Sequence, residues 1–508
     1  MTAPSIDFLT ILPFIIVGGA AVLGVLVETF LGRRARRPVQ LVLVFGSLVA
    51  AFSALIWQSG TRSLEVEGAL ALDGPGVLLM GLIIIVAFVS AMLLAERQLD
   101  PAGDAFAPRA SALPGSVEER ELTARGYLQT EVWPLFLFAV LGMLLFVTST
   151  NLLIMFVALE VMSLPLYLLA GMARRRRLLS QEAALKYFIL GAFSSAFFLF
   201  GSALMYGFAG SVDFAVISDA LAAKPGETTL VVGGVAMISV GLLFKVGAVP
   251  FHQWVPDVYQ GSPAPVTAFM AAAVKIAAVG ALLRVYYVAF GGLRWDWEPL
   301  LWVIAGLTMI VGSLVAIAQT DIKRMIAYSS IAQVGFILMG VSSASPQGLQ
   351  AVIFYLIAYS FTTLGIFAVI SMVRDASGEV TRLDQWAGLG RTSPVVATTF
   401  AIFMLALAGI PLTSGFIAKF LVFEAALSAG AVALVIVGVV ASVIAAVFYV
   451  RVIVIMFFRD PVEGGPRVAV PSAFTTLALS ISAAVTVILG ILPQPVLDLI
   501  EQAGVFLR

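Results

Sequence analysis

The sequence predicts an all-α polytopic membrane protein with about 14 transmembrane helices, on three observations. Of its 508 residues, 61% are hydrophobic and only 11% are charged, with a mean hydropathy of +1.06, whereas an ordinary soluble protein is about 25% charged. Apolar runs long enough to cross about 30 Å of hydrocarbon recur along the whole chain. Basic residues gather in every second loop between these runs.

The apolar runs define the predicted spans. They cover residues 8–31, 39–57, 70–95, 132–149, 151–172, 182–208, 229–251, 263–290, 299–318, 324–342, 349–373, 395–427, 429–458 and 471–492. The runs 395–427 and 429–458 exceed one straight span, so we expect breaks or tilts in them. The first run has no basic residue before it and is longer than a signal-peptide core, so we treat it as a helix.

The distribution of arginine and lysine predicts the orientation. The odd-numbered loops hold 19 of the 29 basic residues, whereas the even-numbered loops and the tails hold 4. Basic residues mark the cytoplasmic side of a membrane. We therefore expect a multi-pass protein of the bacterial inner (plasma) membrane, with both termini outside the cytoplasm.

The chain is predicted to form a single membrane domain, residues 1–508. Its parts are an N-terminal three-helix segment (1–95), a polar cytoplasmic loop (96–131), a first five-helix repeat (132–290), a second five-helix repeat (299–458), and a C-terminal helix and tail (471–508). The polar loop is rich in Pro, Ala, Glu and Arg, which favours a mobile or partner-facing connection.

Spans 4–8 and 9–13 form two sets of five, and an odd number inverts the second set relative to the first. The fourth span of each set, 229–251 and 395–427, carries both a lysine and a proline. Interrupted helices at matching positions of two inverted repeats indicate an ion site in a transporter. The alternative is that proline and glycine are simply common in membrane helices.

Composition excludes several kinds of site. The chain has no cysteine and one histidine, so thiolate-held iron–sulfur clusters and multi-histidine metal or haem sites are excluded. The formal net charge is zero, which gives no case for binding nucleic acid. We expect no cofactor, metal or redox centre in this chain.

Four charged residues lie deep within predicted spans: Glu160, Lys245, Lys275 and Lys419. Insertion scales put the cost of such a charge at about 2.5–3.5 kcal/mol. Burial and a nearby carboxylate shift the pKa of a lysine in opposite directions, so a buried lysine with a movable acidic partner can change protonation near neutral pH. These residues predict a proton relay.

Other charged residues have simpler explanations. Arg284 and Arg451 lie near span ends, where long side chains extend to the headgroups. Lys186 lies about one turn inside its span, and for it snorkelling and function are evenly matched. His252 follows the proline break in VPFHQWVPDVYQG. It either passes protons to the relay or caps a helix end.

Several motifs resemble one known family. The stretch LLFKVGAVPFHQWVPDVYQGSPAPVTAFMAAAVKIAAVGALLRV resembles the signature of the proton-pumping membrane subunits of respiratory complex I and their antiporter relatives. EAALKYFILGAFSSAFFLFGSALMYG, TDIKRMIAYSSIAQVGFILMG and AGIPLTSGFIAKF resemble the subunit N branch, and the likeness runs from about residue 132 to 460.

The resemblance implies a role for each buried charge. Glu160 and Lys245 would form an ion pair, Lys186 would modulate it, Lys275 would be the central relay, and Lys419 would serve the exit half-channel. It also implies that FMN, iron–sulfur clusters and quinone belong to partner subunits, and that this chain joins other membrane subunits and a hydrophilic arm. The 96–131 loop departs from the family pattern.

Three functions are compatible with these features. The leading one is a proton-translocating subunit of NADH:quinone oxidoreductase, driven by redox chemistry in its partners. The alternative is a subunit of a multisubunit sodium/proton antiporter. A free-standing solute carrier ranks below both, because the spans lack the polar or aromatic groups of a substrate pocket.

Overall fold

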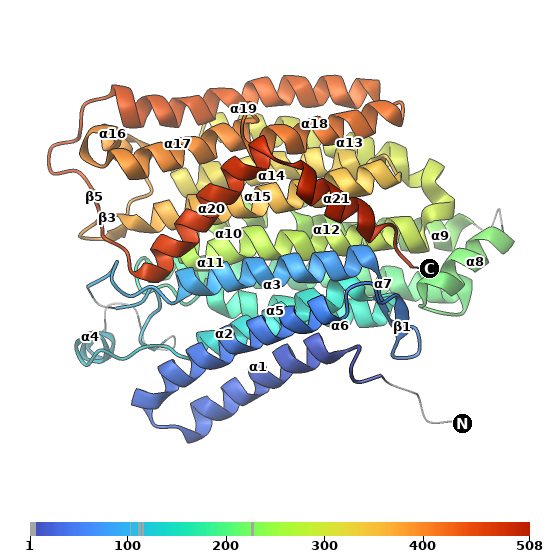
Figure 1. The fold of residues 1–508 in the computed structure, drawn as a ribbon, viewed down its shortest axis with the longest axis horizontal. Helices are drawn as coiled ribbons and strands as arrows, with labels where there is room; N and C mark the ends of the chain where they lie inside the picture. Colours follow the sequence, from blue (N-terminus) through green and yellow to red (C-terminus); the bar gives the residue numbers. More distant parts are fainter. Residues whose placement is uncertain (1–6, 102, 110–112, 114–115, 225–227, 508) are drawn as a thin grey trace.

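Long helices run side by side through the molecule (Figure 1). The computed structural model describes residues 7–507 except 102, 110–112, 114–115 and 225–227. The α-helices are α1 (Leu12–Phe30), α2 (Arg33–Trp57), α3 (Gly74–Leu94), α4 (Val117–Ala124), α5 (Val132–Thr148), α6 (Leu152–Ala170), α7 (Arg177–Ala209), α8 (Phe214–Ala223), α9 (Thr228–Val246), α10 (Trp254–Gly261), α11 (Ala264–Phe269), α12 (Lys275–Arg284), α13 (Arg294–Ile317), α14 (Ile322–Ser342), α15 (Pro346–Met372), α16 (Leu389–Thr392), α17 (Pro394–Ala408), α18 (Ser414–Ser428), α19 (Val432–Phe458), α20 (Ala473–Ile491) and α21 (Gln494–Ala503).

The remaining elements are short. The π-helical turns η1 (Met270–Val274) and η2 (Val285–Ala289) flank α12, and the 3₁₀ turns are η3 (Gly291–Leu293) and η4 (Leu383–Trp386). Strands β1 (Ser63–Glu65) and β2 (Leu70–Leu72) pair with each other, and β3 (Val373–Asp375) pairs with β4 (Gly378–Glu379) and β5 (Arg467–Val468), all antiparallel. These strands lie in connections between the long helices.

Twelve helices in the described residues are long and apolar enough to cross a membrane. Two of the fourteen predicted spans do not meet this length. The span predicted at 132–149 is α5, which is apolar but has only 17 residues. The span predicted at 395–427 is divided into α17 and α18, of 15 residues each.

Two helices are interrupted where a lysine and a proline share a span. In the first, α9 ends at Val246 and α10 begins at Trp254; in the second, α17 ends at Ala408 and α18 begins at Ser414. Gly247 and Gly409 follow the first half-helix of each pair with φ of +86° and +84°. Glycine ends a helix in this left-handed conformation without the steric cost that a side chain brings.

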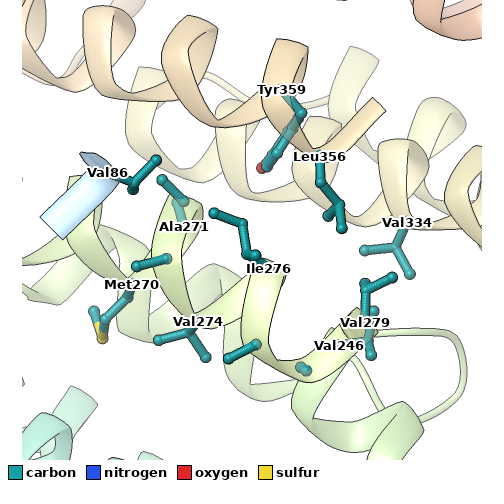
Figure 2. Packing of buried hydrophobic residues seen from close by; sticks show 14 of the residues in the cluster. Val86, Val246, Met270, Ala271, Val274, Ile276, Val279, Val334, Leu356 and Tyr359 are labelled. Atoms are coloured by element: carbon teal, nitrogen blue, oxygen red, sulfur yellow. The ribbon is translucent and has the colours of Figure 1, made fainter. Parts of the chain in front are cut away.

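The centre of the molecule is formed by α11–α12, α14 and α15. Every residue of 264–289 is buried except the half-buried Tyr287, and most of α14 and α15 is buried, whereas most of α20 is not. Figure 2 shows Ile276 and Val279 of α12 close to Val334 of α14 and Leu356 of α15. This central layer carries Lys275.

The described part of the 96–131 loop is attached to both halves of the chain. Asp100 forms salt bridges with Arg175 (3.1 Å) and Arg374 (2.6 Å). Asp104 pairs with Arg174 at 2.8 Å, where burial raises the pKa of the aspartate and the hydrogen bond from Arg174 opposes the rise. The loop is therefore held more firmly at these points than its composition predicts.

The expectation that Arg284 extends to the headgroups is wrong. Its side chain is fully buried and makes two 2.8 Å bonds to the carboxylate of Asp73, and its Nε donates to the carbonyl of Val147 at 2.8 Å. Asp73 also caps α3 through the backbone N–H of Gly76. The sequence does not show this pair because 211 residues separate its members. Arg451, half-buried, donates to the carbonyls of Ile317 and Gln319 at the end of α13.

The Arg284→Gln variant should be strongly destabilised, because it leaves Asp73 as an unpaired buried carboxylate. Breaking such a pair costs about 3–5 kcal/mol. The matched control is Arg391→Gln, which removes the exposed pair with Asp460 and should cost less than about 1 kcal/mol. The measurement is the apparent Tm of the assembled complex in detergent. Equal Tm values for the two variants would contradict a structural role for the Asp73–Arg284 pair.

Candidate functional site

Lys245 lies in the last turn of α9, immediately before the break. Lys245 is 4% exposed. The Nζ donates to the Ser163 hydroxyl at 2.7 Å and to the Tyr187 hydroxyl at 3.3 Å. The Tyr187 ring centre lies 5.3 Å from Nζ. The ammonium is thus surrounded by neutral oxygen and aromatic groups from α6 and α7.

Glu160 does not form the expected ion pair with Lys245. No salt bridge of the described residues joins them within 4.0 Å, and the buried Oε1 of Glu160 has no hydrogen-bond partner. Ser163 lies three residues further along the same face of α6, and its hydroxyl accepts a hydrogen bond from the lysine instead. The two charges remain near enough to interact electrostatically.

Lys186 faces away from the Lys245 site. Its side chain is 44% exposed and forms 2.8 Å salt bridges with Glu182 and with Asp257 of α10. Successive helical residues point about 100° apart, so Tyr187 faces Lys245 while Lys186 faces the outer side of α7. The resemblance implied that Lys186 lies near the Glu160–Lys245 pair, but among the described residues its ion pairs are with Glu182 and Asp257 and not with Glu160. Asp257, which also pairs with Arg324 at 2.6 Å, was missed in the sequence.

Lys275 is the first residue of α12, after the π-helical turn η1. It is 4% exposed, and its Nζ donates to the Ser330 hydroxyl at 2.6 Å and to the Ser330 carbonyl at 3.3 Å. The Tyr359 hydroxyl, visible in Figure 2, donates to the Ser330 hydroxyl at 2.7 Å. No salt bridge of the described residues includes Lys275.

A series of uncharged polar side chains continues from this point toward α17. Ser329 contacts the hydroxyl of Tyr449, and Gln333 donates to that hydroxyl at 3.1 Å and to the Leu407 carbonyl at 2.9 Å. Tyr355 donates to the Gln333 side-chain oxygen. These residues carry no charge, so a search for buried charges missed them. The sequence signal that could have identified them is the SSIAQ segment, because it places Ser329 and Gln333 on one face of a helix.

Lys419 lies near the end of this series, in α18. It is 5% exposed, and its Nζ donates to the Ala408 carbonyl at 3.0 Å and to the Ser442 hydroxyl at 3.3 Å. Ala408 is the last residue of α17, whose final carbonyls lack intrahelical partners. A Cβ added to Gly409 would lie 2.8 Å from Lys419 Cδ. The helix break therefore provides both an acceptor and the space that the lysine occupies.

His252 lies in the break between α9 and α10. It is half-buried, its Nδ1 has no hydrogen-bond partner, and its ring centre lies 6.4 Å from that of Tyr328. No hydrogen bond of the described residues connects it with Lys245. Within the described chain, no group of three or more His, Asp or Glu side chains is arranged to hold a metal ion.

Comparison with known proteins places these features in one family. Residues 149–445 match the family described as NADH:quinone oxidoreductase/Mrp antiporter, TM. The NADH-quinone oxidoreductase subunit N of Rhodococcus opacus is 58% identical over all of this chain and 97% of its own length. The NADH-quinone oxidoreductase subunit N 3 of Streptomyces griseus is 54% identical over all of this chain and 96% of its own.

Solved structures give the same result. A chain of respiratory complex I from Thermus thermophilus is 33% identical, with a TM-score of 0.77 over 96% of this chain and 98% of that chain. A chain of the Mrp complex from Dietzia is 25% identical, with a TM-score of 0.80 over 97% of both chains. The whole length of the chain, with its buried lysines and broken helices, belongs to the family of NADH-quinone oxidoreductase subunit N, the antiporter-like proton-translocating membrane subunits of complex I.

Proposed function

We propose that protons move through this chain along Glu160, Lys245, Lys275 and Lys419. The observation that carries the proposal is that each lysine is buried, at 4–5% exposure, and donates to neutral oxygen acceptors. Among the described residues, none of the three has a carboxylate within hydrogen-bonding distance. A lysine held by a carboxylate keeps its proton, whereas hydroxyl and carbonyl acceptors leave both protonation states accessible. Serine and tyrosine hydroxyls both donate and accept, so they suit proton transfer.

Glu160 sets the charge state of the first lysine. We infer two positions for the Lys245 amine, one on Ser163 and one on Glu160, about one helical turn apart. Pairing with Glu160 favours the ammonium, and the Ser163 position favours passage of a proton toward Lys275. Lys186, together with Asp257 and Arg324, forms an outer charged cluster that would modulate this switch from the α7 side.

Lys419 serves the exit side of the pathway. Ser329, which precedes Ser330 in α14, contacts Tyr449, and Gln333 connects Tyr449 with the Leu407 carbonyl near the end of α17. Lys419 binds the Ala408 carbonyl at this end. The interrupted helix leaves polar backbone groups that water can satisfy. His252 occupies the corresponding break beside Lys245 and would exchange protons there.

We propose the following membrane arrangement. The chain crosses the bacterial inner membrane fourteen times, with α9–α10 and α17–α18 each counted as one interrupted crossing. Residues 132–290 and 299–458 form inverted repeats, and residues 96–131 and the other arginine-rich loops face the cytoplasm. The matching positions of the two breaks and the alternation of basic loops support this arrangement.

Partner subunits complete the proposed activity. The chain works beside other membrane subunits and a hydrophilic arm that carries FMN, iron–sulfur clusters and the quinone site, all surrounded by lipid. The alternative, an Mrp-type sodium/proton antiporter subunit, shares the fold. The 58% identity to a subunit N favours the first assignment. Identification of the polypeptides that co-purify with this chain would separate the two.

Glu160→Ala and Lys245→Ala should each greatly reduce NADH-driven proton pumping, and the quinone reduction coupled to it, while the complex still assembles. The reason is that the two charges act as one switch. Ser163→Ala removes only the neutral resting position of the amine and should reduce pumping less. Pumping is measured by proton uptake into inverted vesicles, with assembly checked on native gels. Normal pumping by an assembled Glu160→Ala or Lys245→Ala complex would refute the switch.

The proposed orientation can be tested by cysteine labelling, because the chain has no native cysteine. Arg176→Cys should react with an impermeant maleimide only from the cytoplasmic side, and Lys224→Cys only from the outside. Both positions are exposed: Arg176 immediately precedes α7, and Lys224 immediately follows α8. Labelling of both positions from one side would show that the number of crossings between them is even.

A further inference from the structure

A large, open and strongly basic cavity lies at the surface, away from the lysine series. Its volume is about 980 Å³ and its lining includes seven arginines and two carboxylates. It is formed by the turn between α1 and α2, the first residues of α2, and the described parts of the 96–131 loop. In Figure 1 this turn and α4 lie at one end of the molecule, and β1 and α8 lie at the other.

The two carboxylates of this cavity leave most of its arginines without a carboxylate of the cavity as a partner. Glu28 is bound by Arg36 at 3.3 Å and by Thr130, and Glu131 accepts a hydrogen bond from Gln129. Four other lining residues, Arg33, Arg34, Arg37 and Arg97, form no salt bridge with any carboxylate of the described residues. Asp104, which is paired with Arg174, offsets part of the charge of Arg37 and Arg97, and the remaining like charges repel one another unless an anion lies between them.

Two of these arginines are held in position without losing their charge. Arg33 stacks on the Tyr127 ring at 4.2 Å, and Arg37 donates to the Ala95 carbonyl at 3.0 Å. Arg34 and Arg97 are exposed. The cavity thus combines guanidinium groups held by protein contacts with exposed ones, and their planar donor pairs match the geometry of a phosphate.

The surface beside the cavity is apolar. On α1, Leu26 and Phe30 are 44% and 78% exposed, and on α2 Val42 is 72% exposed. These residues follow the arginine-lined end of the two helices into the membrane, where acyl chains would lie along them. A free phosphate would use only the charged part of this surface, whereas a lipid uses both parts.

We propose that this cavity binds the headgroup of an anionic glycerophospholipid, with the phosphate among Arg33, Arg34, Arg37 and Arg97 and the acyl chains along α1 and α2. The site rests on the orientation given under Proposed function, since basic clusters bind anionic lipids at the cytoplasmic face. It also gives a role to the described part of the 96–131 loop, which forms one wall of the cavity. An acidic segment of a neighbouring subunit is the competing occupant.

The test uses the purified complex in nanodiscs that contain photoreactive phosphatidylglycerol or photoreactive phosphatidylcholine. Phosphatidylglycerol should label peptides of α1 and α2 preferentially. The Arg34→Gln/Arg97→Gln double variant should weaken this labelling by about 30-fold at low salt, since each arginine near the surface contributes about fivefold. Arg382→Gln, which removes an exposed arginine paired with Asp384 outside the cavity, should leave labelling unchanged.

Further arms identify the source of the anion. Inorganic phosphate and deacylated glycerophosphoglycerol should compete poorly, and displacement by either at micromolar concentration would mean that a soluble anion is the ligand. Equal labelling by the two lipids, or unchanged labelling in the double variant, would overturn the proposal. A cross-link to an acidic segment of another subunit in place of lipid would also overturn it. Proton pumping, measured on the same samples, reports separately on the proposed function.

Discussion

The structure depends on one constraint: three lysine amines are buried at membrane depth with neutral oxygen partners. A bare ammonium in hydrocarbon is expensive, at about 2.5–3.5 kcal/mol on insertion scales. Serine hydroxyls, tyrosine hydroxyls and helix-end carbonyls offset part of this cost at Lys245, Lys275 and Lys419. These neutral partners leave both protonation states of the lysine accessible, whereas a directly paired carboxylate would favour the protonated state.

The unusual backbone features follow from the same constraint. Lys245 and Lys419 each lie beside a helix interruption, and Lys275 follows a π-helical turn. Each irregularity frees polar backbone groups or opens space, which a continuous α-helix does not provide. Among the described residues, Lys245 differs from the other two lysines in its electrostatic interaction with a buried acid, Glu160.

Hydrophobicity and charge were sufficient to predict most of the fold. The apolar runs predicted nearly every long helix, because crossing a membrane requires length and apolarity that a sequence shows directly. The structure has fewer long helices than predicted. One predicted span is a helix of only 17 residues and another is divided into two helices, so both are apolar but too short. Arg284 was misassigned because its partner, Asp73, is distant in sequence and close in space.

The deep position of the lysines was predictable, whereas their partners were not. Lys245, Lys275 and Lys419 stand out because charge is rare in apolar runs. Their hydrogen bonds go to Ser163, Ser330 and the Ala408 carbonyl, which are ordinary groups in a membrane helix until packing brings them together. Which face a residue takes also required the structure, as Lys186 and Tyr187 show. Although they are neighbours in sequence, Lys186 pairs with the carboxylate of Asp257, whereas the Tyr187 hydroxyl accepts a hydrogen bond from Lys245.

The most direct test of this account is the number of protons pumped per NADH oxidised by complexes that carry Lys275→Arg. Arginine fills a similar length and stays protonated throughout the accessible pH range. A relay that requires Lys275 to release its proton predicts a marked loss of pumping in an assembled complex with intact flavin-site activity. An unchanged ratio of protons to NADH would contradict the account and leave Lys275 as a structural charge.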